Sequence, residues 1–152
     1  MKTGQKGIDL IMHFETGDNL DKYLTSYQDS VGVWTIGVGS TYYEDGTKVK
    51  KGDKITKERA IQLFSSILPR YENDVRRLVK VPLTQNQFDA LVSFTYNLGA
   101  ANLSKSTLLK KVNANPNDSS IADEFIKWNK AGGRVLAGLT RRRKSESYLY
   151  FS

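Results

Sequence analysis

Apolar residues recur at steps of three and four along most of this chain, which is the spacing of helices with one buried face. The longest stripe predicts a helix over residues 57–80 with a bend near Pro69, and two helices are the alternative. A shorter stripe predicts a helix over residues 3–14. Four further helices are predicted from Thr84 to Gly99, from Ser104 to Val112, from Ser119 or Ser120 to Gly132, and from Leu139 to Phe151. The first of these begins with a capping box of Thr84 and Gln87.

The stretch from Tyr27 to Thr41 follows a different period, because its pattern repeats every second residue, as in a strand. One face would carry Val31, Val33 and Thr35, and the other would carry Trp34, Ile36 and Val38. Asp45 and Gly46 predict a two-residue turn between flanking strands. We therefore expect residues 20–50 to form a small antiparallel sheet.

These elements predict a mainly helical α+β fold in a single domain of 152 residues. We expect an N-terminal lobe with the small antiparallel sheet at residues 15–60, a long connecting helix at 57–80, and a helical C-terminal lobe at 81–152. The helix over residues 3–14 would pack with the C-terminal lobe. A chain of this length can bury roughly 70% of its unfolded surface, so it needs no crosslink for stability.

The chain contains no cysteine and a single histidine, His13. The lack of cysteine excludes disulfides, thiolate metal sites and cysteine nucleophiles. A serine–histidine–aspartate triad would have to use His13, and a zinc hydrolase would lack its usual nitrogen ligands. Chemistry built on carboxylates remains open, and we expect no cofactor and no metal.

The chain carries 23 lysine and arginine residues against 16 acidic residues, a net charge of +7. This excess favours nucleic acid, an anionic membrane surface or an acidic cell-wall polymer, without choosing among them. Basic and aromatic residues do not interleave on one face, so we expect no nucleic-acid binding. The apolar segment 8–14 is interrupted by Asp9 and His13 and is too short for a signal peptide or a membrane span, so we expect a soluble chain.

Two carboxylates stand out as a possible acid–base pair. Glu15 follows the apolar helix 3–14, where the helix dipole disfavours negative charge, so it suits a protonated general acid. Asp29 lies in a turn beside Ser30, which suits an ionised partner, and Thr35 could help to hold a water near it. Because 16 acidic residues offer many such pairs, a surface glutamate and a turn aspartate are the ordinary alternative.

Four blocks of the sequence carry a family resemblance. They are Phe14-Glu15 with Tyr27-x-Asp29 and Gly32 to Gly39, then Gln85 to Gly99, Ser106 to Asn113, and Phe125 to Arg143. In this order, and over nearly the whole chain, they resemble the phage-type lysozymes, the endolysin muramidases of tailed phages and prophages. The resemblance implies a lysozyme-like fold of two lobes.

The resemblance also implies an active site of Glu15 as the acid, Asp29 as the second carboxylate and Thr35. The reaction would be hydrolysis of the β-1,4 bond between N-acetylmuramic acid and N-acetylglucosamine in peptidoglycan. Glu15 would protonate the leaving oxygen, while Asp29 and Thr35 would position the attacking water and stabilise positive charge on the sugar. The family favours inversion, in which the two carboxyl groups stand about 6.5–9.5 Å apart.

Two places depart from the family pattern. Residues 16–21 look like an insertion, which makes Asp18 and Asp21 rivals of Asp29 for the second role. Ser40 stands where the family commonly has a histidine that forms a structural ion pair, so the departure affects a stabilising contact and not the chemistry.

Further residues fall where the resemblance implies contact with the glycan. These predicted substrate-binding residues are Thr41, Tyr96, Asn97, Thr107 and Arg142. Arg142 or its neighbour Arg141 could also pair with Glu15, although an arginine run at the start of a helix is commonly a solvated face.

The resemblance implies partners and a location as well. The substrate would be the glycan strands of peptidoglycan, bound by a monomer without stable membrane insertion. The protein would accumulate in the host cytoplasm and reach the periplasm and cell wall at lysis through a separate holin. A non-catalytic wall-binding protein and a nucleic-acid binder are the alternatives, and intact Glu15, Asp29 and Thr35 argue against the first.

Overall fold

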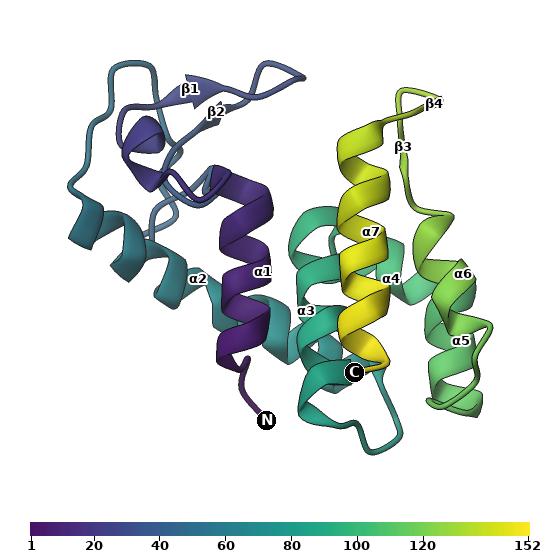
Figure 1. Ribbon diagram of the computed structural model, residues 1–152. Coiled ribbons are helices and arrows are strands. Elements are labelled where there is room, and N and C mark those ends of the chain that lie inside the picture. Colours follow the sequence, from purple (N-terminus) through teal and green to yellow (C-terminus); the bar gives the residue numbers. More distant parts are fainter. The chain divides into compact units, whose positions relative to one another are not determined.

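The computed structural model describes residues 1–152 and contains seven α-helices, one 3-10 helix and four short strands (Figure 1). In chain order they are α1 (Gln5–Thr16), η1 (Leu20–Tyr23), β1 (Tyr27–Gln28), β2 (Trp34–Thr35), α2 (Lys57–Leu78), α3 (Gln85–Leu98), α4 (Ala100–Lys105), α5 (Thr107–Ala114), α6 (Ile121–Ile126), β3 (Lys130–Ala131), β4 (Arg134–Val135) and α7 (Ala137–Tyr150). This content confirms the predicted class, a mainly helical α+β fold.

The chain divides into two compact units, which we describe separately. The first, here called the helical unit, comprises Met1–Ile11 and Arg70–Ser152. The second, here called the sheet unit, comprises Met12–Pro69. Helices α1 and α2 each contribute residues to both units.

The sheet unit contains one antiparallel hairpin, in which Tyr27 pairs with Thr35 and Gln28 pairs with Trp34. Three isolated bridges join Thr25 to Lys54, Ile36 to Ser40 and Tyr42 to Lys48. The antiparallel pairing was predicted, but its extent over residues 20–50 was predicted wrongly. Gly37 and Gly39 adopt left-handed φ values of 63° and 72°, so the chain turns back after β2 and the strand does not continue.

The turn predicted at Asp45 and Gly46 is present but wider than two residues. The Tyr43 amide donates to the Thr47 carbonyl (2.9 Å), which leaves residues 44–46 in the loop. Gly46 has a φ of 87°, as expected for the left-handed position of a three-residue hairpin loop. Asp45 Oδ1 accepts from the Thr47 amide (2.9 Å) and braces the loop.

A small apolar core supports the hairpin of the sheet unit. It consists of the buried side chains of Ile36, Val49 and Leu63, with Trp34, Tyr43, Ile55 and Ile67 packed against it. Burial of each large side chain is worth about 1.5–3 kcal/mol, so this cluster holds the chain that follows β2 in place.

The longest predicted helix is confirmed as one element, α2 (Lys57–Leu78), with Pro69 inside it. It begins after Thr56, whose hydroxyl accepts from the Arg59 amide (3.1 Å). The helix ends two residues before the predicted boundary, since the Lys80 amide donates instead to Asn113 Oδ1 (2.7 Å).

Within the helical unit, helix α3 begins with the predicted capping box. Thr84 Oγ1 accepts from the Gln87 amide (3.1 Å), and Gln87 Oε1 accepts from the Thr84 amide (2.9 Å). The prediction of one helix from residue 104 to 112 is wrong. Ser106 is extended and its hydroxyl accepts from the Leu109 amide (3.0 Å), so it closes α4 and caps α5.

The helical unit contains one hairpin that the sequence pattern did not predict. Strands β3 and β4 pair through Lys130 with Val135 and Ala131 with Arg134. Gly132 and Gly133 have φ values of 58° and 77°, which a tight turn of this hand requires. Glycines that we interpreted as a helix break therefore form a two-residue turn.

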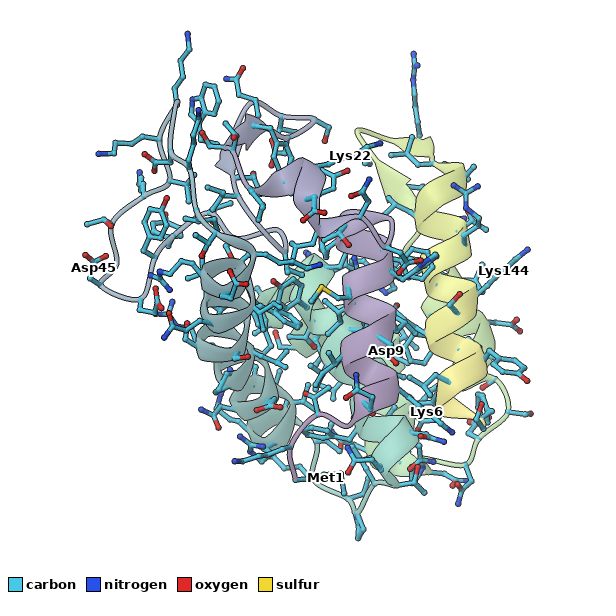
Figure 2. All side chains as sticks on the ribbon, turned by 60° about the vertical axis from the view of Figure 1, so that its left-hand side comes forward. Met1, Lys6, Asp9, Lys22, Asp45 and Lys144 are labelled. Atoms are coloured by element: carbon cyan, nitrogen blue, oxygen red, sulfur yellow. The ribbon has the colours of Figure 1, made fainter.

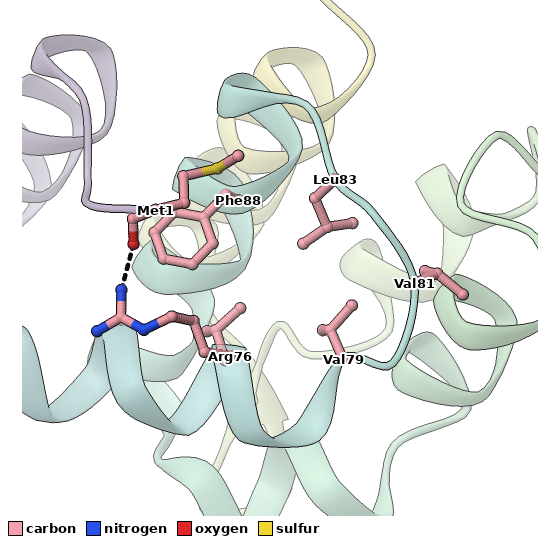
Figure 3. Close-up of a pocket in the computed structure, with 7 residues that line it drawn as sticks. Met1, Arg76, Val79, Val81, Leu83 and Phe88 are labelled. Atoms are coloured by element: carbon pink, nitrogen blue, oxygen red, sulfur yellow. Dashed lines mark hydrogen bonds between the residues drawn. The ribbon is translucent and has the colours of Figure 1, made fainter.

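Charged side chains such as Lys6, Lys22, Asp45 and Lys144 are exposed at the surface (Figure 2). No helix combines the length and apolar character needed to cross a bilayer. An open apolar pocket of about 220 Å³ in the helical unit is lined by Met1, Val75, Arg76, Val79, Val81, Leu83 and Phe88 (Figure 3). It contains no carboxylate, and the Arg76 guanidinium at its edge donates to the Met1 carbonyl, so it offers no acid–base pair.

Candidate active site

Glu15 lies at the C-terminal end of α1, where the helix ending holds the backbone around it. The buried Thr16 donates from Oγ1 to the carbonyl of Met12 (2.7 Å). Gly17 and Asp18 then adopt left-handed φ values of 60° and 61°, which end the helix. The half-buried Glu15 side chain therefore projects from a well-anchored last turn.

The segment that looks like an insertion contains the two rival carboxylates. Asp18 pairs with His13, with 2.6 Å between Oδ2 and Nδ1. Asp21 is exposed in the first turn of η1. Neither lies on the hairpin that carries Thr35, so the arrangement favours Asp29 as the second carboxylate.

Gly39 makes room for the carboxyl group of Glu15. A Cβ atom placed on Gly39 would lie 3.0 Å from Glu15 Oε1, 3.2 Å from Cδ and 3.3 Å from Oε2. Gly39 also has a φ of 72°, a conformation that side chains disfavour. The Glu15 carboxyl group thus packs on bare backbone, which explains the glycine at this point of the motif.

The main chain of Val33 holds Asp29 and Thr35 relative to each other. The Val33 amide donates to Asp29 Oδ1 (2.9 Å), and the Val33 carbonyl accepts from the Thr35 hydroxyl (2.9 Å). The same carbonyl accepts from the Asp29 amide (2.9 Å). Asp29 Oδ1 accepts a second bond, from the Val31 amide (2.9 Å). Both predicted site residues are therefore anchored on one residue between them.

This anchoring determines which oxygen atoms can accept a hydrogen bond from a water. Asp29 Oδ1 receives both amide donors, so Oδ2 is the oxygen suited to accept from a water. The Thr35 hydroxyl proton is engaged by Val33, so the Thr35 oxygen acts as an acceptor. A water that donated to Asp29 and Thr35 would keep an oxygen lone pair for attack.

Tyr27, which we did not predict as a site residue, is the strand partner of Thr35 and is influenced by the charges of both carboxylates. Burial raises the pKa of the Tyr27 phenol to about 12, with further contributions from the charge of Glu15, from Tyr23 and from the charge of Asp29. Its ring centroid lies 5.0 Å from that of Tyr23. The spacing of Tyr27 and Asp29, two residues apart, was the available sequence signal, because such residues share a strand face.

Four of the predicted substrate-binding residues lie in the helical unit, and Thr41 lies half-buried in the sheet unit. The Tyr96 ring packs 4.8 Å from Tyr71 between centroids. Asn97 Oδ1 accepts from Arg143 Nη2 (2.8 Å). Thr107 is exposed and lines an open pocket of about 390 Å³ with Lys105, Ser106, Glu124, Lys127 and Trp128. Their contact with glycan stays a prediction.

Arg142 belongs to a buried ionic cluster of the helical unit. Its Nε donates to Glu146 Oε2 (3.4 Å), and its Nη2 donates to the Ser93 carbonyl (3.3 Å). Arg143 Nη2 also donates to Glu146 Oε2 (3.1 Å), as does the Ser93 hydroxyl (2.6 Å). Arg142 is only 3% exposed, so it is not the solvated arginine that a run of basic residues suggests.

Residues 22–146 match the family described as phage lysozyme. The chain is 41% identical over 152 residues to the endolysin of Bacillus phage B103, a match that spans all of this chain and 55% of that protein. It is 41% identical over 124 residues to the endolysin of Salmonella phage P22, which is 82% of this chain and 84% of that protein. It is 34% identical over 120 residues to the SAR-endolysin of Enterobacteria phage P21, which is 79% of this chain and 70% of that protein.

The fold is likewise similar to solved structures. The endolysin from Escherichia coli O157:H7 phage FAHEc1 matches with a TM-score of 0.87 and 40% identity, over 99% of this chain and 93% of that chain. The muramidase domain of SpmX from Asticaccaulis excentricus matches with a TM-score of 0.83 and 35% identity, over 99% of this chain and 98% of that chain.

Proposed function

Since this chain belongs to the phage lysozyme family, we propose that it is an endolysin with muramidase activity, which hydrolyses the β-1,4 bond between N-acetylmuramic acid and N-acetylglucosamine in peptidoglycan. The observation that carries the proposal is the hairpin in which the Val33 main chain anchors both Asp29 and Thr35. The close packing of the Glu15 carboxyl group on Gly39 supports the proposal for the other carboxyl group, the general acid.

In the proposed reaction Glu15 is the general acid and gives its proton to the glycosidic oxygen as the bond to the anomeric carbon breaks. A water held by Asp29 and Thr35 attacks that carbon, and Asp29 takes the proton that the water loses. The net result is one new hydroxyl on each sugar, a protonated Asp29 and an ionised Glu15. Exchange with solvent then restores both carboxyl groups.

We propose that the configuration of the anomeric carbon is inverted. The Asp29 carboxylate is tied to two main-chain amides and would share the attacking water with Thr35, which suits a base better than a nucleophile. Proton NMR of the first-formed product of a short glycan tests this step. Inversion predicts the α-anomer at early times, and an initial β-anomer would instead assign a retaining mechanism.

The acid is tested by turbidity assays on outer-membrane-permeabilised Gram-negative cells. Glu15→Gln is expected to abolish clearing, and equal clearing by this variant and the wild type would remove Glu15 from the mechanism. Mass spectrometry of the products adds a second criterion. A hydrolase leaves a reducing muramic acid end, whereas a lytic transglycosylase leaves an anhydro end.

The second carboxylate is tested with matched variants of three nearby aspartates. Asp29→Ala is expected to be inactive, while Asp18→Ala and Asp21→Ala keep wild-type activity. These two controls make the same chemical change within residues 16–21, where Asp18 pairs with His13. Activity in Asp29→Ala with loss in Asp18→Ala would place the second carboxylate in that segment.

The proposal extends to the route of the protein. It acts as a monomer that accumulates in the host cytoplasm and reaches the wall at lysis through a separate holin. Expression in cells with and without a holin tests this route. Lysis without a holin would instead favour holin-independent export, which the name of the SAR-endolysin relative suggests. The net charge of +7 should attract the anionic wall, so clearing should slow as ionic strength rises.

A further inference from the structure

The register of the β1–β2 hairpin brings a third side chain to the face that carries Asp29 and Thr35. Tyr27 is the direct partner of Thr35 across the two strands, and opposed residues of an antiparallel pair project to the same side. Asp29 follows Tyr27 by two residues, and its amide continues the pairing to the Val33 carbonyl (2.9 Å). Tyr27, Asp29 and Thr35 therefore leave the hairpin on one face.

The same tyrosine experiences the charge of the acid as well. Glu15 is the larger of the two carboxylate influences on the Tyr27 phenol, and Asp29 is the smaller. The phenol is thus within electrostatic reach of both the residue assigned as acid and the residue assigned as base. In a two-carboxylate glycosidase the reacting sugar lies between these groups, so the hairpin face that carries Tyr27, Asp29 and Thr35 is the face that would meet this sugar.

The environment also determines what the Tyr27 hydroxyl can do. Burial and the neighbouring negative charges keep the phenol protonated throughout the working pH range of a cell. It is therefore a permanent neutral donor next to two groups that act as acid and base. Such a donor suits a neutral acceptor, and a sugar hydroxyl or N-acetyl oxygen is the neutral acceptor that a glycan offers.

We propose that Tyr27 is a further substrate-contacting residue of the site, whose hydroxyl donates a hydrogen bond to the sugar bound between Glu15 and Asp29. The proposal rests on the muramidase function proposed above. It assigns Tyr27 to recognition of the reacting sugar and gives a reason for a tyrosine, not a phenylalanine, opposite Thr35.

The test is Tyr27→Phe, which removes one oxygen and keeps the ring that packs 5.0 Å from Tyr23. We expect kcat/KM on purified peptidoglycan to fall about tenfold with the thermal midpoint unchanged. Tyr23→Phe is the matched control, since it makes the same change in the stacked neighbour, and it should retain wild-type kcat/KM. In the inactive Glu15→Gln background, Tyr27→Phe should weaken binding of a soluble muropeptide about tenfold in calorimetry.

The outcomes separate this proposal from the one on which it rests. Full activity and full muropeptide affinity in Tyr27→Phe, with Glu15→Gln inactive, would overturn the role of Tyr27 and leave the active site standing. A loss of activity that follows a lowered thermal midpoint, with affinity unchanged, would assign Tyr27 to folding and overturn the proposal as well. Activity in Glu15→Gln would instead remove the active site itself.

Discussion

Replacement of Glu146 by glutamine should destabilise the helical unit more than any exposed charge change. Glu146 is 0% exposed, and Arg143 beside it is also 0% exposed. The Arg143 Nε lies 2.7 Å from Glu146 Oε1, a close ion pair whose angle does not meet hydrogen-bond geometry, while Arg143 Nη2 and Arg142 Nε donate to Oε2 at 3.1 and 3.4 Å. One carboxylate therefore contacts two buried guanidinium groups.

The magnitude follows from the charge that is left behind. Removing one partner of a buried ion pair costs about 3–5 kcal/mol, because the other charge stays buried and loses that partner. We expect about 3 kcal/mol in the free energy of unfolding, since the amide of glutamine keeps an oxygen that can accept from the Ser93 hydroxyl, now at 2.6 Å. At about 2–4 °C per kcal/mol for a chain of this size, the thermal midpoint should fall by roughly 6–12 °C.

Urea unfolding followed by circular dichroism at 222 nm measures this loss. Asp74→Asn is the matched control, because Asp74 Oδ1 pairs with Arg77 Nη2 (3.2 Å) at the same sequence spacing. In this pair 62% of the arginine side chain is exposed. An exposed pair of this kind contributes about 0.2–1 kcal/mol. A change below 1 kcal/mol in Glu146→Gln would refute the reasoning, since the two arginines would then not depend on this carboxylate.

Three further predictions concern single positions. Gly39→Ala should lower kcat at least tenfold, because the new Cβ would lie 3.0 Å from Glu15 Oε1. The φ of 72° at this position should also lower the free energy of unfolding by about 1–2 kcal/mol. Wild-type clearing by this variant would contradict the packing of Glu15 on residue 39. Ser40→Ala should raise the free energy of unfolding by about 1 kcal/mol, because the hydroxyl of Ser40, a residue that is only 3% exposed, has no hydrogen-bond partner. A variant that unfolds at lower urea concentration than the wild type would show instead that the hydroxyl is hydrogen-bonded. Hydrogen bonds from Lys111 and then Lys127 hold the pKa of Glu124 below its ordinary value of 4.5. The stabilising contribution of Glu124 is therefore complete above pH 4.5 and disappears as pH falls through the lower folded pKa. Urea midpoints from pH 7 to pH 3 should fall less in Glu124→Gln than in the wild type, and parallel curves would count against a stabilising role of the Glu124 ion pairs.

Much of the fold could be predicted because its signals are local. The stripe of α2 and the capping box of Thr84 and Gln87 depend on residues within a few positions of one another. The hairpin at Gly132 and Gly133 was missed because a pair of glycines ends a helix and makes a tight turn equally well. Only the pairing of the flanking residues, which no local pattern encodes, distinguishes the two.

The site shows the same division between local and distant signals. Asp29 and Thr35 could be proposed from the motif, whereas their attachment to Val33 could not, because main-chain hydrogen bonds have no side-chain signature. The ion pair of Asp18 with His13 could not be predicted either, and the choice between Asp18 and Asp29 stays a prediction. The packing of Glu15 on Gly39 joins residues from α1 and from the turn after β2, and the sequence alone does not place them in contact.

The attachment of Asp29 and Thr35 to the main chain of Val33 makes the number of residues between them more important than the side chains of Val31 and Val33. Val31 and Val33 are 80% and 44% exposed, so their side chains should accept many substitutions without harm to the site. An extra residue would act differently, because a shift of one position in a strand turns every following side chain to the opposite face. The length of this turn is therefore fixed, whereas the side chains at positions 31 and 33 can vary.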